Sequence, residues 1–482
     1  MDMAIVGGGA AAVGLLDALA VAGLGEPGTV TVFEPSAHLW RGRPYGPDLD
    51  AVRVNAPPAI MSIRHGDFGH YAAWLGERGS AYVDELLGQP LVPRALYGDY
   101  LAHTADAALA ALGEAGWGVR VVPDRVTGVD RPGGRLLLRT EAAGKHEATH
   151  VVVCVGAGAP SDLYGLDGAP GYISDPYPLA GTLDRVEDDD EVAVIGSGLT
   201  AVDVAVSLAA RGHAGPITLL SRSGVLPHVW QRPTGRRPRH LTVERVTDLH
   251  QRTDRVGWED LIGLLRAELA EAGEDFEAFT GDLLATGDED PVRRLRRQIG
   301  AVADPSVGRR MLQEAAHTVG PYVWRLLPDS DRARLRSHLR TAISVASPMV
   351  PVNAAVLLRL LDAGQLTLVR GIRGMEAVKG RFRVHGGDRG GFSADVVINA
   401  VNSAPPSVPD AARQLVGSMV DTGLASLHPS GGAVPADPRV HVVGDLSGGG
   451  SFVTASIPGL AVQAARVAQA LGSGRPLAGT RS

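Results

Sequence analysis

Two short glycine-rich stretches constrain the fold of this chain more than any other feature. The first, AIVGGGAAAVG, places Gly7, Gly9 and Ala12 in the spacing GxGxxA between an apolar run and a stretch of small helix-forming residues. In a strand–turn–helix unit of this kind the first glycine permits the sharp turn and the second lets a pyrophosphate approach the backbone. The small third residue lets the helix pack on the strand. We therefore expect a dinucleotide-binding unit with a strand over residues 3–6 and a helix over residues 10–22.

A carboxylate follows the next strand-like segment at the distance that such a unit requires. Residues 29–33, TVTVF, predict a second strand, and it ends at Glu34, 22 residues after Ala12. A carboxylate about 20 residues beyond the glycines can accept hydrogen bonds from ribose hydroxyls. The alternative, an ordinary strand–helix–strand turn followed by a surface glutamate, stays open on these residues alone.

The second stretch, EVAVIGSGLTA, repeats the same spacing. Gly196, Gly198 and Ala201 take the three roles, and Leu199 and Thr200 open the predicted helix within the turn's reach of a bound phosphate. The chain therefore contains two units with the same dinucleotide-binding pattern.

The second unit differs from the first in the residues that follow its second strand. The strand expected over residues 217–220 ends in Ser221 and Arg222, the latter 21 residues after Ala201. A carboxylate there would repel a 2′-phosphate, whereas a hydroxyl and a guanidinium group bind one through charge-assisted hydrogen bonds. The second unit is therefore expected to prefer NADPH, with a solvated loop arginine as the alternative interpretation.

Each unit is followed by similar β-rich segments. In the first half, residues 119–122 lead to a strand-rich stretch that ends in the apolar run 150–158. In the second half, residues 366–371 lead to a similar stretch that ends at 395–401. Residues 236–345 instead alternate charged and apolar residues with helical spacing. This order predicts an α/β fold with two Rossmann-like domains, each a three-layer ββα arrangement, and a helical insertion.

Composition excludes several classes of function. The 482 residues are 45% hydrophobic and carry a net charge of −7, which gives no basic field for nucleic acid or an anionic membrane. The single cysteine, Cys154, excludes an internal disulfide and a CxxC redox pair. No apolar run is long enough to cross a bilayer, and the opening residues lack the basic start of a secretory signal, so a cytoplasmic protein is expected. Small molecules are the expected partners, and the histidine spacing predicts no metal site.

The chain resembles the flavoproteins with two dinucleotide-binding domains, in the group of FAD- and NADPH-dependent N-hydroxylating monooxygenases. The resemblance covers nearly the whole length and rests on GGGAAA with Glu34, RGRPYG (41–46), VRVNAPP (52–58), VPRALYGDYL (92–101), VIGSGLTAVDVA with SRSGVLP, and VHVVGD near the end. It implies FAD on the domain formed by residues 1–170 plus 396–482, NADPH on residues 171–235 plus 346–395, and a helical insertion at 236–345.

The resemblance also implies further site residues in the first domain. Gly444 and Asp445 would lie beside the ribityl or pyrophosphate part of FAD, with the closing helix directed toward the flavin ring. Arg43 is counted with the cofactor-binding residues, and Asn55 is the candidate catalytic residue because it matches a family position close to the flavin. On the residues alone, an asparagine in VNAPP is equally well explained as a turn residue.

The implied reaction uses NADPH to reduce FAD, and the flavin hydroperoxide formed with O2 passes one oxygen atom to a small amine or amino acid. One departure counts against ornithine or lysine as the substrate. In NAVNSAPP, Val401 and Asn402 replace the Thr and Gly of the motif usual in those hydroxylases. The first 100 residues are closer to relatives that oxidise aspartate to nitrosuccinate. The alternatives are an NADPH-linked flavin reductase that passes electrons to another acceptor, and a flavin-holding protein without catalysis.

A substrate carboxylate would need a cationic partner. Arg43, Arg53 and Arg64 in the first domain and Arg325 in the insertion are the candidates, although an arginine in such a place is more often a surface or cofactor-contacting residue than a substrate ligand. The sequence does not fix how many chains associate, and a homo-oligomer is compatible with it.

Overall fold

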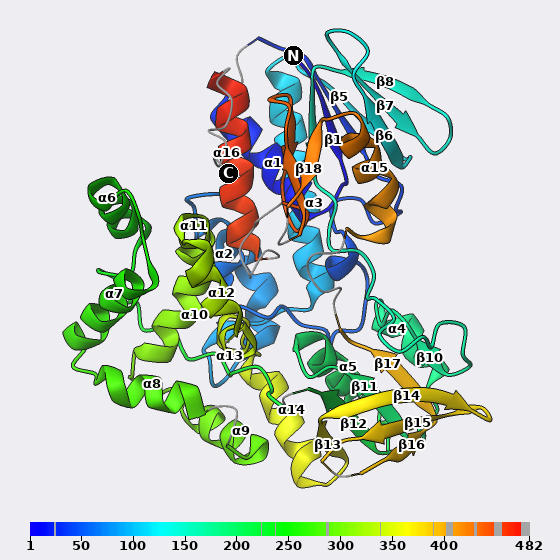
Figure 1. Ribbon diagram of the computed structural model, residues 1–482, viewed down its shortest axis with the longest axis vertical. Coiled ribbons are helices and arrows are strands. Elements are labelled where there is room, and N and C mark those ends of the chain that lie inside the picture. Colours follow the sequence, from blue (N-terminus) through cyan, green and yellow to red (C-terminus); the bar gives the residue numbers. More distant parts are fainter. Residues whose placement is uncertain are drawn as a thin grey trace.

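The computed structural model describes residues 1–23, 26–222, 224–236, 238–285, 289–337, 339–388, 390–401, 408–428, 431–447 and 456–473. Two parallel five-stranded sheets lie at opposite ends of the long axis of the molecule, and a group of helices runs along one side (Figure 1). This arrangement confirms the predicted α/β fold with two Rossmann-like domains.

The first sheet has the strand order β20–β9–β1–β2–β5, all parallel. Its strands are β1 (Asp2–Val6), β2 (Thr29–Phe33), β5 (Gly118–Val122), β9 (His150–Val153) and β20 (Val440–Val442). Met3 and Ile5 of β1 contribute to the core shared with the helices α1 (Ala10–Ala22), α3 (Arg94–Glu114) and α16 (Ile457–Ser473). Ala4 and Val6 belong to a second core on the opposite face, because successive strand residues point to opposite sides.

The second sheet repeats this plan with the order β10–β17–β11–β12–β13. Its strands are β10 (Tyr172–Ile173), β11 (Val192–Ile195), β12 (Ile217–Ser221), β13 (Leu366–Arg370) and β17 (Val396–Asn399). The helices α5 (Leu199–Ala210) and α14 (Pro351–Asp362) cover one face. An antiparallel sheet of β14 (Ile372–Val378), β15 (Arg381–Gly386) and β16 (Phe392–Ala394) covers the other.

The first sheet has an equivalent antiparallel cover. It consists of β6 (Val126–Asp130), β7 (Leu136–Thr140) and β8 (Lys145–Ala148), packed with α15 (Asp410–Asp421). Each domain is therefore a layer of helices, a parallel sheet and a smaller antiparallel sheet, as the sequence predicted. The smaller elements of the first domain are α2 (His70–Leu75), β3 (Val83–Asp84), β4 (Gln89–Pro90), β18 (Ala425–Leu427) and β19 (Ala433–Pro435), and α4 (Leu179–Thr182) precedes β11.

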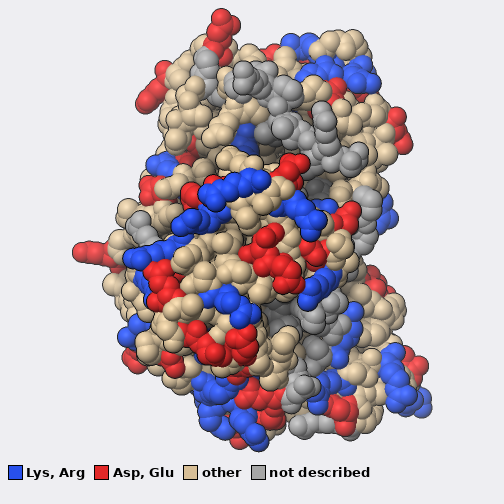
Figure 2. Space-filling view, turned by 60° about the vertical axis from the view of Figure 1, so that its left-hand side comes forward, with Lys and Arg blue, Asp and Glu red and all other residues tan. Residues whose placement is uncertain are grey.

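The segment between β12 and α14 is helical, as expected. Its helices are α6 (Val243–Thr253), α7 (Trp258–Glu271), α8 (Phe276–Leu284), α9 (Pro291–Gly300), α10 (Gly308–Thr318), α11 (Gly320–Leu326), α12 (Asp329–Ser337) and α13 (Leu339–Ala346). Figure 2 shows acidic and basic side chains intermixed on the face that it presents, which leaves no broad patch of one sign there. Among the described helices, none is both long and apolar enough to cross a membrane.

One boundary differs from the expectation. Residues 396–399 were expected in the first domain, but they form β17, which pairs with β10 and β11 in the second sheet. The run VVIN identifies a buried strand, whereas the sheet that it joins depends on partners about 200 residues away in the sequence.

A buried charged cluster joins the two domains. Nη2 of Arg94, the first residue of α3, lies 2.5 Å from Oδ2 of Asp203 near the start of α5. Tyr177 donates its hydroxyl proton to Asp203, and Nη1 of Arg94 donates to the hydroxyl of Tyr177 at 3.0 Å. Nε of Arg94 donates to the backbone oxygen of Arg53 at 2.9 Å. Arg94 and Asp203 are 7% and 1% exposed, so the pair holds the domains together out of water.

Gly7 provides a test of the first turn. Its φ is +101°, and a Cβ atom there would lie 2.7 Å from the carbonyl oxygen of Cys154. Gly7→Ala is therefore expected to lower the free energy of unfolding by about 1–3 kcal/mol. Gly417→Ala, on the exposed face of α15 with no described atom near its Cβ position, should raise it by about 0.5–1 kcal/mol. Denaturant unfolding measures both; equal effects would contradict the assigned geometry of the turn.

The buried pair between the domains provides a second test. Arg94→Met leaves the Asp203 carboxylate buried without its cationic partner and is expected to cost about 3–5 kcal/mol of stability. Arg94→Met combined with Asp203→Leu removes both charges and should recover much of that loss. A double-mutant cycle of unfolding free energies measures the coupling. Additive effects would show that the two residues do not interact.

Candidate functional site

The first glycine turn leaves the N-terminus of α1 open to an anion. The conformation of Gly7 brings the turn against the backbone of Cys154, at the end of the neighbouring strand β9. Gly9 caps α1 without a side-chain hydrogen bond, and the first turn of the helix has no acidic residue. Ala12 is fully buried against the sheet. The free N–H groups and the helix dipole therefore point to where a pyrophosphate would bind.

Glu34 lies beside this turn, as expected. One carboxylate oxygen accepts the N–H of Gly8 at 2.7 Å and the other accepts the N–H of Ser36 at 2.8 Å. These bonds fix the carboxylate at the end of β2. A carboxylate has about four acceptor sites, so it retains capacity for two ribose hydroxyls.

The loop after β2 folds over the turn. The N–H of Trp40 donates to the oxygen of Gly8 at 2.7 Å, and a Cβ on Gly9 would lie 3.5 Å from Cα of Gly42. Arg43 follows, but Nε donates to Asp175 at 2.9 Å and the guanidinium group lies over the ring of Tyr177. Arg43 therefore contacts the second domain and would have to leave Asp175 to bind a cofactor.

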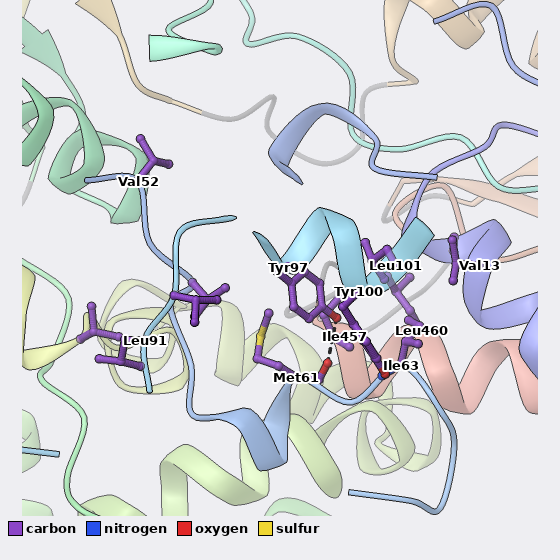
Figure 3. Packing of buried hydrophobic residues seen from close by; sticks show 14 of the residues in the cluster. Val13, Val52, Met61, Ile63, Leu91, Tyr97, Tyr100, Leu101, Ile457 and Leu460 are labelled. Carbon is purple, nitrogen blue, oxygen red and sulfur yellow. Dashed lines mark hydrogen bonds between the residues drawn. The ribbon is translucent and has the colours of Figure 1, made fainter. Parts of the chain in front are cut away.

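The last strand of the first sheet ends at the same turn. Gly444 has a φ of +101°, and a Cβ there would lie 3.5 Å from the side chain of Ala11 in α1. Its N–H donates to the side chain of Gln463 in α16 at 2.8 Å. Figure 3 shows Leu460 and Ile457 of α16 near Leu101 of α3, in the core that α16 shares with α1. Asp445, partly buried, is thus held next to the N-terminus of α1.

The second turn copies the first. Gly196 has a φ of +119°, and its Cβ position lies 3.0 Å from the backbone oxygen of Ala400, which follows β17. Gly198 caps α5 without a side-chain bond, and no described atom lies within 4 Å of its Cβ position. Leu199 and Thr200 open α5, and Ala201 is fully buried. This turn also leaves space and free N–H groups for a phosphate.

The residues expected to select NADPH lie at the edge of the second sheet. Ser221 ends β12 and accepts the N–H of Gly224 on its hydroxyl at 3.2 Å, while Arg222 is exposed. Arg370 pairs with Ser221 on the adjacent strand β13, with Nε 3.2 Å from Asp388. Arg370 was not expected from the sequence, where its signal is its place at the end of the strand-like run LTLVR.

Asn55 lies where the two domains and the insertion meet. Its backbone oxygen accepts Nε1 of Trp230 at 2.6 Å, and the Trp230 ring stacks on that of His317 in α10, with centroids 6.2 Å apart. Oδ1 of Asn55 is buried and has no hydrogen-bond partner among the described residues. This amide oxygen is therefore able to accept a hydrogen bond from a ligand or a water molecule.

Other buried polar atoms near Trp230 also lack partners in the described part of the chain. They are Oε1 of Gln231, Oε1 of Gln313 and Nδ1 of His317. Gln313 donates its amide to the oxygen of Val229 at 3.2 Å, which places it beside the same segment. Burial lowers the pKa of His317 to about 4, partly opposed by a hydrogen bond to the backbone of Ala346, so the imidazole is neutral. None of these three residues was expected from the sequence, because no motif or residue spacing near them indicates a site.

The candidate substrate arginines are engaged elsewhere. Arg53 donates to the oxygen of Leu91 at 2.9 Å and lies over the ring of Tyr82. Arg64 forms a paired contact with Asp17 of α1, with Nη2 2.7 Å from Oδ1. Either would have to give up these contacts to bind a substrate carboxylate. The side chain of Arg325, in α11, lies outside the described part of the structure.

The sequence also singled out Val401 and Asn402. Val401 packs near the second turn, where its side chain lies 3.3 Å from the Cβ position of Gly196. Asn402 lies outside the described residues. Over the described ranges, no three His, Cys, Asp or Glu side chains come together in a group that could hold a metal ion.

Comparison with known proteins agrees with the geometry of the first turn. Residues 4–158 match a family model described as FAD-NAD(P)-binding. The chain is 27% identical over 323 residues to uncharacterized proteins of Mycobacterium bovis and Mycobacterium tuberculosis. The match covers 57% of this chain and 60% of the length of those relatives.

Solved structures extend the comparison to the whole fold. An L-lysine 6-monooxygenase from Pseudomonas syringae is 16% identical, with a TM-score of 0.59 over 98% of this chain and 99% of that one. An ornithine N-hydroxylase from Kutzneria sp. 744, solved with reduced FAD, NADP+ and L-ornithine, is 15% identical, with a TM-score of 0.57 over 98% and 99%. A cadaverine monooxygenase from Erwinia amylovora, bound to FAD, is 14% identical, with a TM-score of 0.59 over 98% and 95%. The chain therefore matches an FAD-NAD(P)-binding family model over residues 4–158 and has, over nearly its whole length, the fold of these amine hydroxylases.

Proposed function

We propose that this protein is an FAD-dependent, NADPH-using monooxygenase that N-oxidises a small amine or amino acid. The observation that carries the proposal is the pair of glycine turns, each at the N-terminus of an uncapped helix, in two domains joined by a buried ion pair. Buried polar atoms without described partners lie at the junction of the domains, where a substrate would meet both cofactors.

The residues of each turn fit the cofactor assigned to it. Gly7, Gly9 and Glu34 would hold the pyrophosphate and ribose of FAD, with Asp445 next to them. Gly196 and Gly198 would hold the pyrophosphate of the nicotinamide cofactor.

The phosphate-selecting edge of the second sheet combines a hydroxyl with two guanidinium groups. Ser221, Arg222 and Arg370 would surround the 2′-phosphate, because β12 and β13 end side by side. A phosphate dianion between two arginines gains charge-assisted hydrogen bonds that NADH cannot make. β12 ends in a serine at the position where a carboxylate would favour NADH, and Arg370 would have to leave Asp388 to bind the phosphate.

The oxygen-transfer chemistry would come from reduced FAD and O2. The chain's part is to position the substrate and to exclude water from the junction. Amide oxygens of Asn55 and Gln313 and the neutral imidazole of His317 accept hydrogen bonds from an amine without adding a charge. A nucleophilic amine must be unprotonated, and a buried site without a carboxylate partner favours that form.

The substrate panel should begin with aspartate. The sequence departure at Val401 and Asn402 counts against ornithine and lysine, and the first 100 residues resemble relatives that convert aspartate to nitrosuccinate. FAD-loaded protein, incubated with NADPH, O2 and single amino acids, is expected to give an N-oxidised product detected by mass, with O2 consumed only when the substrate is present.

The same assay distinguishes a flavin reductase. If NADPH oxidation continues undiminished without O2 when an artificial electron acceptor is present, and no amine on the panel yields an oxygenated product, the protein passes electrons to another acceptor. A purified protein that takes up no FAD and does not oxidise NADPH would overturn the proposal.

Cofactor preference tests the role of Arg222. Arg222→Ala should weaken NADPH binding by ~1.5–3 kcal/mol, or about ten- to hundredfold, because one charge-assisted contact to the 2′-phosphate is lost. NADH binding should barely change. KM values for both cofactors provide the measurement, with Arg120→Ala, an exposed arginine on β5, as the control. Equal losses for NADPH and NADH would show that Arg222 does not bind the 2′-phosphate.

A further inference from the structure

A continuous row of aromatic rings leads from the first cofactor turn to the surface. The ring centroids of Tyr45 and Tyr97 are 4.7 Å apart, those of Tyr97 and Tyr100 are 5.4 Å apart, and those of Tyr100 and Trp74 are 5.5 Å apart. All three distances fall in the range of direct ring contact. Figure 3 shows Tyr97 and Tyr100 close together on α3, beside Met61 and Ile63.

The inner end of the row lies at the proposed FAD cradle. Tyr45 ends a short 3-10 helix, Arg43–Tyr45, that directly follows the glycine packed on Gly9. Burial raises the pKa of Tyr45 to about 12, with Asp445 adding to the rise and Arg94 opposing it. Tyr45 is therefore within electrostatic reach of Asp445, the carboxylate assigned to the ribityl or pyrophosphate part of FAD.

The outer end of the row reaches solvent. Trp74 is partly exposed at the end of α2, and the guanidinium group of the exposed Arg78 lies 5.0 Å above its ring. The exposed His103 lies 6.2 Å from Trp74 on its α3 side. A reductant in solution can therefore approach Trp74.

Tyr100, in the middle of the row, has a proton acceptor. The N–H of Ile63 donates to the Tyr100 hydroxyl oxygen at 3.2 Å, so the hydroxyl proton is available to Nδ1 of His70 at 2.8 Å. Burial and then Arg64 lower the pKa of His70, with His103 acting in the same direction and Asp17 and Asp67 opposing. A neutral imidazole at this distance can take the phenol proton when the ring loses an electron, which avoids a charged radical in a buried site.

We propose that Tyr45, Tyr97, Tyr100 and Trp74 form an electron relay that carries one-electron oxidising equivalents from the flavin site to the protein surface. Tyr100 gives one electron, through Tyr97 and Tyr45, to an oxygen-centred radical at the flavin site, which takes up a proton from solvent and becomes a hydroxyl compound or water, while the hydroxyl proton of Tyr100 passes to Nδ1 of His70. Trp74 then returns an electron to Tyr100, and the proton moves back from His70 to the phenol oxygen. A soluble one-electron reductant of the ascorbate class finally reduces the Trp74 radical. The relay rests on the proposed binding of FAD and not on the identity of the substrate.

Light provides the oxidant for the test, because photoexcited FAD is a strong one-electron acceptor. FAD-loaded protein is illuminated, and tyrosyl and tryptophanyl radicals are followed by transient absorption and by electron paramagnetic resonance in frozen samples. The wild type should show both radicals. Tyr100→Phe should lower the tryptophanyl signal, since phenylalanine cannot be oxidised in its place and the remaining route through Tyr71 has a longer contact of 6.4 Å with Trp74. His70→Gln, which keeps a hydrogen-bond acceptor but takes no proton, should lose the tyrosyl signal.

Tyr71→Phe is the matched control. Tyr71 is 1% exposed, and its ring centroid lies 5.0 Å from Tyr97, 4.8 Å from Tyr100 and 6.4 Å from Trp74. Its hydroxyl is buried without a hydrogen-bond partner in the described structure, and the direct contact of Tyr97 with Tyr100 remains when Tyr71 is replaced. This variant should keep both radicals. Equal loss in Tyr71→Phe and Tyr100→Phe, or an undiminished tryptophanyl signal in Tyr100→Phe, would overturn the relay while FAD remains bound. Absence of bound FAD, read from the visible spectrum, would instead overturn the cofactor assignment.

Discussion

The buried contact between Arg94 and Asp203 sets the relation between the two halves of the molecule. Each half completes its own sheet, so contacts between the halves fix the distance between the glycine turns. Arg94 begins α3, which packs on α1, and Asp203 lies near the start of α5. The ion pair thus connects the helix of the second turn, α5, to the helix that packs on α1. Buried pairs add little net stability compared with apolar contacts, but breaking one is costly, so they favour a single orientation.

The two halves use the same backbone geometry and different charges. Gly7 approaches the oxygen of Cys154, and Gly196 approaches that of Ala400, because in each domain the first strand turns sharply beside the end of its neighbour. Both helices begin without a capping side chain. The difference lies at the end of the second strand, where Glu34 in one half corresponds to Ser221 and Arg222 in the other. Geometry therefore provides a general phosphate cradle, and the charge at this edge determines which dinucleotide it suits.

Local sequence signals predicted the local structure well and the long-range contacts poorly. The helix expected over residues 10–22 and the strand over 29–33 agree with α1 and β2, because glycine turns and apolar runs act over a few residues. The assignment of residues 396–399 to the first domain was wrong, because their pairing with β11 joins segments about 200 residues apart in the sequence. Arg43 and Arg64 show the same limit: their partners, Asp175 and Asp17, lie 132 and 47 positions away, and no local pattern marks a guanidinium group as already satisfied. Gln313 and His317 were missed because no local pattern marks a buried polar atom without a partner, and Arg370 was missed because its place beside Ser221 depends on the pairing of β12 with β13.

The two unusual polar regions of the interior differ in whether their buried polar atoms have hydrogen-bond partners. Around Trp230, the side-chain atoms of Asn55, Gln313 and His317 are buried without described partners, and each such atom costs about 1–3 kcal/mol unless a ligand or water bonds to it. A bound ligand that forms hydrogen bonds with several such atoms would regain this free energy. Tyr100 differs, since its hydroxyl already bonds to Ile63 and His70 and needs no ligand. Its pairing with a neutral imidazole is suited to moving a proton rather than to binding. The proposed substrate site at Trp230 and the proposed relay along the aromatic row therefore use different residues.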